Sequence, residues 1–158
     1  MRDEGGTAAV TTLVMLPLLL IVLVGVLELG ALRAVAFRAT AAADLATLVA
    51  VSDQDQAELV RTGTLRLTAD AVEIARDYFA RNLAATVPAL ATGAIEIAAS
   101  ADIASFPVAP SIDPRTGARY DRPTIRLIAA IPVKTPGFAA LLMPTVTTIA
   151  VHSVSSPR

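Results

Sequence analysis

The chain has 158 residues, of which 54% are hydrophobic and 17% are charged, and its net charge is −1. A disordered tail would be highly charged, and a nucleic-acid-binding domain would carry a strong positive field, so the composition argues against both. Cysteine is absent, which excludes disulfides, thiolate metal sites and cysteine nucleophiles.

The first predicted element is a membrane-spanning helix. The sequence from Gly5 to Leu27 contains no charged residue, and its centre is almost wholly aliphatic. A bilayer core of about 30 Å needs ~20 apolar helical residues, which predicts a span at about residues 11–29. A cleaved secretory signal is the alternative, but its apolar core is shorter and its start is basic, whereas this chain begins with Asp3 and Glu4 after Arg2.

The helix is predicted to continue beyond the membrane, as one element over residues 7–51. Pro17 lies inside it and is expected to bend it. Glu28, at the far end of the span, is interpreted as an interfacial carboxylate, or alternatively as a pairing group for a neighbouring subunit. The next twenty residues are rich in alanine, with a narrow apolar stripe at helical spacing: Leu32, Val35, Ala39, Ala42, Leu45 or Ala46, and Val49. This half is expected to pack closely against a partner helix or a small sheet.

A polar break at residues 52–56 is predicted to end the long helix. A second helix is expected over residues 64–90, with Thr68 as a possible N-cap and an ion pair between Asp77 and Arg81. Its predicted buried side is formed by Ala71, Ile74, Tyr78, Leu83 and Thr86.

Three strands are predicted from period-2 alternation, over residues 94–103, 124–133 and 145–155. In the second strand, Thr124 and Arg126 are expected to point outward and the alternate apolar residues inward. The connection over residues 104–123 contains turn chemistry around Pro114 and Gly117 and is a candidate contact surface. The predicted fold class is therefore α+β: a long N-terminal membrane-anchored helix, a second helix and a small three-stranded antiparallel sheet, covered by helix on one face.

Residues that could carry chemistry are few. His152, the single histidine, is predicted to be exposed on an edge strand. Asp53, Asp55 and Glu58 resemble a fragment of an oxygen-ligand cluster but lack the glycine and glutamate spacing of a calcium loop, so a solvated polar break is favoured. No nucleophile elbow, phosphate loop or zinc spacing is present. An enzyme is not expected, and neither catalytic residues, a cofactor nor a metal is predicted.

The N-terminal segment resembles TadE-like proteins, the pseudopilins of tight-adherence (Flp-type) pilus systems. The resemblance rests on Gly6 followed by a short polar and small-residue segment, an aliphatic helix with the early Pro17, the Glu28-Leu29-Gly30 triplet, and an alanine run containing Asp44. It covers about the first fifty residues. Thr11 stands where the family usually has a glutamate.

This resemblance implies a type IV pilin-like fold and cleavage by a prepilin peptidase between Gly6 and Thr7. The chain would then comprise a leader at residues 1–6, the helix at 7–51 and an extracytoplasmic head at 52–158. It would be a minor structural pseudopilin of a Tad/Flp-type pilus or secretion apparatus. Its implied partners are membrane lipid, other pilin-like subunits, assembly proteins and the prepilin peptidase, with no nucleic acid.

Location and orientation follow from the same reasoning. The resemblance implies a single-pass protein of the bacterial inner (cytoplasmic) membrane, with its head outside and in some states in a surface pilus. Counting bases alone gives the opposite orientation, since Arg33 and Arg38 follow the span; the resemblance is preferred. The alternative function is a signal-anchored cell-envelope protein whose head is a binding module outside any filament.

Overall fold

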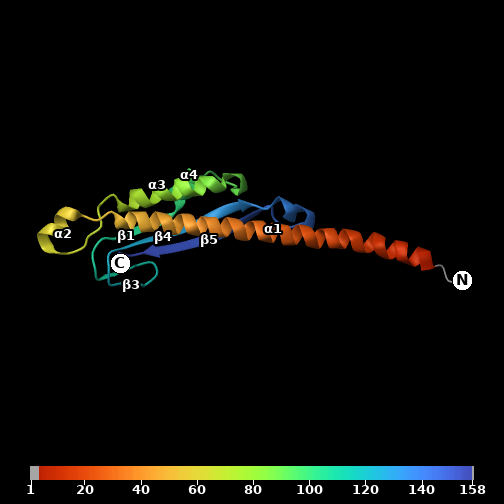
Figure 1. Ribbon diagram of the computed structural model, residues 1–158, viewed down its shortest axis with the longest axis horizontal. Coiled ribbons are helices and arrows are strands. Elements are labelled where there is room, and N and C mark those ends of the chain that lie inside the picture. The colour runs from red at the N-terminus through yellow and green to blue at the C-terminus, as the bar shows by residue number, and fades with distance from the viewer. Residues whose placement is uncertain (1–3, 158) are drawn as a thin grey trace.

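One helix dominates the structure. The computed structural model describes residues 4–157, and it describes the side chains of residues 12–157 apart from Ala140. Helix α1 (Glu4–Ser52) is continuous through Pro17, and its N-terminal half extends well beyond the packed part of the molecule (Figure 1). The predicted long helix is therefore confirmed, and it ends at the predicted polar break.

The remaining helices are short. Asp55 caps the first of them through a hydrogen bond from the Glu58 backbone N–H to its carboxylate, and Gly63 ends it with a positive φ of 72°. The bounds are α2 (Gln56–Thr62), α3 (Ala71–Leu83), the 3₁₀ helix η1 (Ala84–Ala89), α4 (Ala94–Ser100) and the 3₁₀ helix η2 (Pro136–Leu141).

The second predicted helix is shorter than expected, and its buried face is different. Thr68 is not its N-cap; its hydroxyl donates to the Asp53 carboxylate, and α3 begins three residues later. The buried side is Ala71, Ala75, Phe79 and Leu83, whereas Tyr78 is exposed. Phe79 fills the space against α1 that the smaller neighbouring residues cannot fill.

The prediction of a strand over residues 94–103 is wrong for its first seven residues, which form α4. The buried residues Ala94, Ile97, Ala98 and Ala101 follow the three- and four-residue spacing of a helix, while Ile95 is 80% exposed. The alternation of isoleucines imitated a strand, but the alanine content and Glu96 in the first turn favour a helix. Only Asp102–Phe106 forms a strand, β1.

Three antiparallel strands make the sheet, in the order β1–β4–β5. Strand β4 (Thr124–Lys134) is central and pairs with β1 through Ile103 opposite Leu127, and with β5 (Val146–Ser155) through Ile131 opposite Ile149. The two other predicted strands are thus confirmed. A small hairpin, β2 (Ser111–Ile112) and β3 (Arg119–Tyr120), lies in the connection between β1 and β4, and Gly117 takes its expected positive φ of 73°.

The core lies between the sheet and the C-terminal half of α1. Ala39, Ala43 and Ala46 have no exposed surface, so the helix lies close to β4 and β5 on one side and to α3 on the other (Figure 1). The sheet contributes the predicted inward residues: Ile125, Leu127, Ala129, Ile131 and Val133 of β4 and Val151 of β5. The alanine-rich half of α1 is therefore a structural part of the head.

The outward orientation predicted for Thr124 and Arg126 does not leave them exposed. Both are buried, at 0% and 3% exposure. The segment that carries the β2–β3 hairpin supplies a buried carboxylate, Asp113, to the Arg126 side chain, and the Thr124 hydroxyl forms hydrogen bonds with the Arg122 carbonyl and with Ser156 Oγ, each at 2.8 Å. Period-2 alternation identifies which residues share a face, but it does not show what covers that face.

Candidate functional site on the long helix

The N-terminal half of α1 presents an apolar surface on all sides. In the described part of the chain it is the one helix long and apolar enough to cross a membrane. Its large apolar side chains between Leu13 and Leu29 are mostly 46–75% exposed. Such exposure is unfavourable in water, and it is what a lipid-facing or helix-facing segment requires.

The C-terminal half of α1 has a second apolar face, opposite the buried alanines. Phe37, Leu45 and Leu48 are 77%, 43% and 55% exposed. They continue a stripe at helical spacing whose members are Gly30, Ala34, Phe37, Ala41, Leu45 and Leu48. A Cβ placed at Gly30 would meet nothing within 4 Å, so packing within this chain does not require glycine there.

A shallow groove of about 250 Å³ lies beside this stripe. On its α1 side the groove is lined by Phe37, Arg38, Ala41, Ala42 and Leu45, and on the other side by Asn82, Ala85 and Thr86 from α3 and η1. The stripe and groove together, called here the outer α1 face, make a mostly apolar surface, with Arg38 at its side, that another helix could cover.

A hydrogen-bonded cluster fastens the last strand to α1. The Ser153 hydroxyl donates to Oδ1 of Asp44 at 2.6 Å. The buried Thr47 hydroxyl lies 2.9 Å from Ser153 Oγ, 2.8 Å from Ser155 Oγ and 3.1 Å from the Asp44 carbonyl. Asp44, predicted to lie off the apolar stripe, thus holds β5 in register on the helix.

The sequence reasoning missed a buried charge cluster on the other face of the sheet. Arg126 Nε lies 3.0 Å from Asp113 Oδ2, and Arg126 Nη1 lies 3.0 Å from Asp102 Oδ2, which also pairs with Arg115. An arginine in the middle of an otherwise apolar strand was the available signal, because a buried arginine requires a carboxylate partner.

Asp113 also shapes its own turn. Its carboxylate accepts hydrogen bonds from the Arg115 backbone N–H at 2.9 Å and the Thr116 hydroxyl at 2.7 Å. Burial raises the pKa of Asp113, but these hydrogen bonds and the Arg126 charge outweigh it and leave the pKa below its ordinary value. The Asp113 carboxylate is therefore ionised at neutral pH, where it faces the Arg126 guanidinium.

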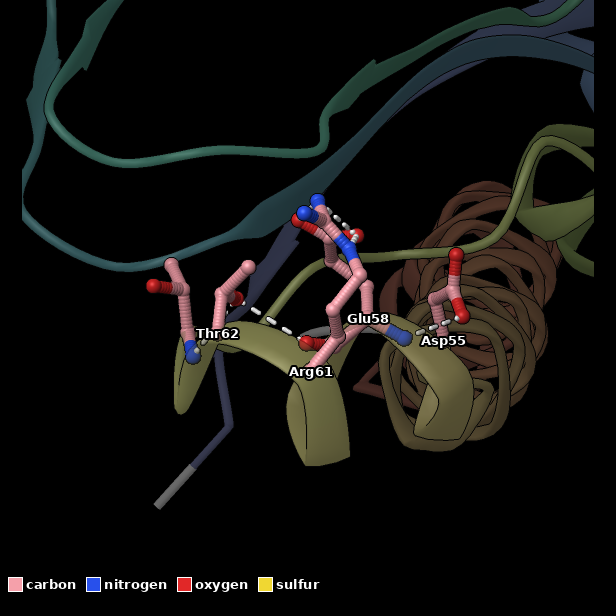
Figure 2. Close-up of polar contacts among 5 residues, drawn as sticks. Asp55, Glu58, Arg61 and Thr62 are labelled. Carbon is pink, nitrogen blue, oxygen red and sulfur yellow. Dashed lines mark hydrogen bonds and ion pairs between the residues drawn. The ribbon is translucent and has the colours of Figure 1, made fainter.

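The acidic residues at the polar break have structural partners, and Figure 2 shows those of Asp55 and Glu58. Asp55 caps α2, Glu58 pairs with Arg61 at 2.7 Å, and Asp53 accepts from Thr68. Within residues 4–157, no three His, Asp or Glu side chains gather where a metal ion could bind. His152 is exposed on the edge strand β5, opposite Ile128 of β4, as predicted.

The surfaces of α1 are thus the main candidate for function. A comparison of this chain with known protein families finds a match in the same segment. Residues 5–53 match a family model described as Flp pilus-assembly TadE/G-like (Tad). The N-terminal segment of this chain is therefore similar to TadE/G-like proteins. Comparisons with curated proteins and with solved structures give no match. The match begins and ends within one residue of α1, so the family resemblance is confirmed for the helix, while the head outside α1 lies beyond it.

The residues taken from the TadE-like pattern are distributed along α1. Gly6, Thr7 and Thr11 lie in its first turns, and residues 1–3 of the predicted leader lie outside the described residues. Pro17 and Gly30 are exposed, and Glu28 is half-buried. The structure brings Asp44 together with Ser153 and Glu28 together with Gly137, but it does not bring the motif residues together with one another.

Proposed function

We propose that this protein is a minor pseudopilin-like structural subunit of a Tad/Flp-type pilus or a related secretion apparatus. The observation that carries the proposal is the coincidence of the TadE/G-like match with α1, whose apolar surface is exposed on both sides of the proposed membrane boundary. Residues 11–29 anchor the subunit in the inner membrane, and the head over residues 52–158 lies outside the cytoplasm.

Assembly takes place along the outer α1 face. In the membrane, the N-terminal half of α1 contacts lipid; in a filament, the helices of neighbouring subunits replace that lipid. Gly30 allows close approach of a second helix at the membrane boundary. Beyond it, Phe37, Leu45 and Leu48 offer apolar area that the head of this chain leaves uncovered.

Maturation removes the leader. Prepilin peptidase cuts after Gly6 and leaves Thr7 as the new N-terminus. Thr11 stands where the family usually has a glutamate, so this chain has no carboxylate there to pair with the terminal amine of a neighbouring subunit. Packing between helices therefore supplies more of the free energy of subunit association.

The test is N-terminal sequencing of the protein from cells that contain the pilus peptidase, followed by analysis of sheared surface appendages. We expect a mature N-terminus at Thr7 and the mature protein in the sheared fraction. The Gly6→Leu variant should keep its leader, whereas the matched Gly5→Leu variant should be processed. A full-length protein that stays in the membrane fraction would instead support a signal-anchored envelope binding module.

Orientation is tested separately, with protease added to intact spheroplasts. Digestion of the head while the span at residues 11–29 survives is expected. A head that is protected until the membrane is opened would place it in the cytoplasm and would refute the proposed topology.

A further inference from the structure

The connection between β4 and β5 lies against the membrane-spanning part of α1. A Cβ placed on Gly137 would lie 2.7 Å from Glu28 Oε2 and 3.2 Å from Val24 Cγ1. One placed on Gly25 would lie 3.8 Å from Leu141 Cδ1. The connection, which includes η2, therefore touches the last turns of the span, and in Figure 1 it forms the end of the head nearest the free half of α1.

This contact places the connection at the depth of the bilayer surface or below it. The proposed span ends near Leu29, and Gly25 lies four residues before that, which corresponds to about 6 Å along a helix. Leu141, beside Gly25, is thus about one helical turn inside the proposed end of the span.

Apart from Thr145, the exposed side chains around the tip of this connection are apolar. Leu142 is 98% exposed, and Met143 and Val146 are 49% and 47% exposed. The sequence from Thr135 to Val151 contains no charged residue. Lys134, at the end of β4, and Arg33, about one turn beyond Glu28 on α1, are exposed bases on the side away from the membrane centre.

The backbone holds this apolar tip in a fixed shape. Leu142 adopts a left-handed conformation with φ 55°, which is uncommon for a leucine and is costly unless the surroundings fix it. The Leu142 N–H donates to the Ala139 carbonyl at 3.1 Å, and the Met143 N–H donates to the Phe138 carbonyl at 3.0 Å. Thr135 closes the base of the connection through hydrogen bonds to the Thr145 and Pro144 carbonyls.

We propose that residues 138–146, centred on Leu142, dip into the outer leaflet of the membrane and form a second lipid contact beside α1. The proposal rests on the proposed function, because it requires residues 11–29 to span the bilayer. Lipid is the favoured occupant because the patch is continuous with the lipid-facing surface of α1 and lies at the same depth. Interfacial apolar segments flanked by bases bind membranes in this way.

A second contact would fix how the head is oriented. A single helix allows the head to rotate about the helix axis and to tilt, whereas a tip inserted beside it removes the rotation. The outer α1 face would then point in a set direction along the membrane plane, available to a neighbouring subunit. Extraction into a filament would require the tip to leave the membrane together with the span.

The test uses single-cysteine variants of the full chain, which has no cysteine of its own. Leu142→Cys, Leu20→Cys and Val60→Cys are each labelled with a polarity-sensitive fluorophore and reconstituted in phosphatidylcholine–phosphatidylglycerol vesicles. Leu20 reports the span, and Val60, 87% exposed in α2 at the far end of the head, reports water. Quenchers are nitroxide-labelled lipid in both leaflets and aqueous iodide.

We expect the label at Leu142 to be quenched by nitroxide lipid, as the label at Leu20 is, and the label at Val60 to be quenched by iodide alone. Quenching at Leu142 by iodide but not by lipid, with Leu20 still quenched by lipid, would overturn this inference and leave the membrane span intact. Shielding of Leu142 from both quenchers would mean that protein covers the tip, which also overturns it. Loss of lipid quenching at Leu20 would instead refute the span on which the proposed function depends.

A second variant tests whether Leu142 itself makes the contact. Leu142→Asn is suitable because asparagine tolerates the left-handed conformation while removing the apolar side chain. With the label at Thr145→Cys, this substitution should shift quenching from lipid towards iodide. Unchanged lipid quenching would overturn the role given to Leu142.

Discussion

Removing the Thr47 hydroxyl tests whether the cluster at Asp44 fastens β5 to the long helix. Thr47→Val keeps the shape of the side chain and deletes its oxygen. Ser153 already donates its proton to Asp44, so Thr47 donates to Ser153 or to the Asp44 carbonyl and accepts from Ser155. The substitution therefore removes one donated and one accepted hydrogen bond from a fully buried position.

The expected cost follows from that count. A neutral hydrogen bond contributes about 0.5–1.5 kcal/mol net, so two give a loss of about 1–3 kcal/mol in the free energy of unfolding. For a chain of this size, each 1 kcal/mol lowers Tm by about 2–4 °C. Ser155 is half-buried and can bond to water instead, which favours the lower part of the range.

The assay is guanidinium unfolding of the full chain in detergent, followed by circular dichroism. Thr40→Val is the matched control, because Thr40 is exposed on the same helix and the change in helix propensity is the same. A double-mutant cycle with Ser153→Ala measures the coupling directly. A Thr47→Val variant that costs no more than Thr40→Val would refute the role of the cluster.

Three further outcomes are expected. Because the folded-state pKa of Asp113 is lowered, its ionisation stabilises the fold above its ordinary pKa of 3.8, and this stability is lost as pH falls from that value through the lower folded-state pKa; Asp113→Asn should flatten the acid limb of a stability–pH curve, and an unchanged slope would contradict the assignment. Gly137→Ala should displace the flexible Glu28 carboxylate and crowd Val24, at a cost of up to about 1 kcal/mol, whereas Gly93→Ala, with open space around its Cβ, should cost less, as unfolding measurements will show. Phe37→Glu should leave stability within about 0.5 kcal/mol but reduce recovery in sheared appendages; normal recovery would remove the outer α1 face from the assembly model.

Long, regular patterns were predictable from the sequence, and short or non-local features were not. The apolar residues of α1 recur at helical spacing, and those of β4 and β5 alternate with polar residues, in each case over ten residues or more. A pattern of this length can be identified in a single sequence. Residues 94–100 supply only two helical turns, and their isoleucines fit both periods. The sequence placed Arg126 on the correct face but not its burial, because its partner Asp113 reaches it through tertiary structure rather than through local pattern.

The candidate site was predictable where it depends on composition and unpredictable where it depends on packing. The apolar span and the alanine stripe were identified from the residues alone, but the choice between Leu45 and Ala46 was not. The structure buries Ala46 and exposes Leu45, because alanine allows the sheet to approach the helix closely. The leucine that remains outside then becomes part of the outer α1 face.

The length of the exposed apolar surface of α1, of which the outer α1 face is the second half, limits what can cover it. Exposed apolar side chains extend from Leu13 to Leu48, a distance of about 54 Å at 1.5 Å per residue. Lipid can cover the first half, but its acyl chains end where the bilayer ends, at about 30 Å. A globular partner could cover the second half without replacing the lipid on the first. A helix of similar length and composition covers both without a break, which is why we expect the partner in the assembled state to be another pilin-type helix lying along α1.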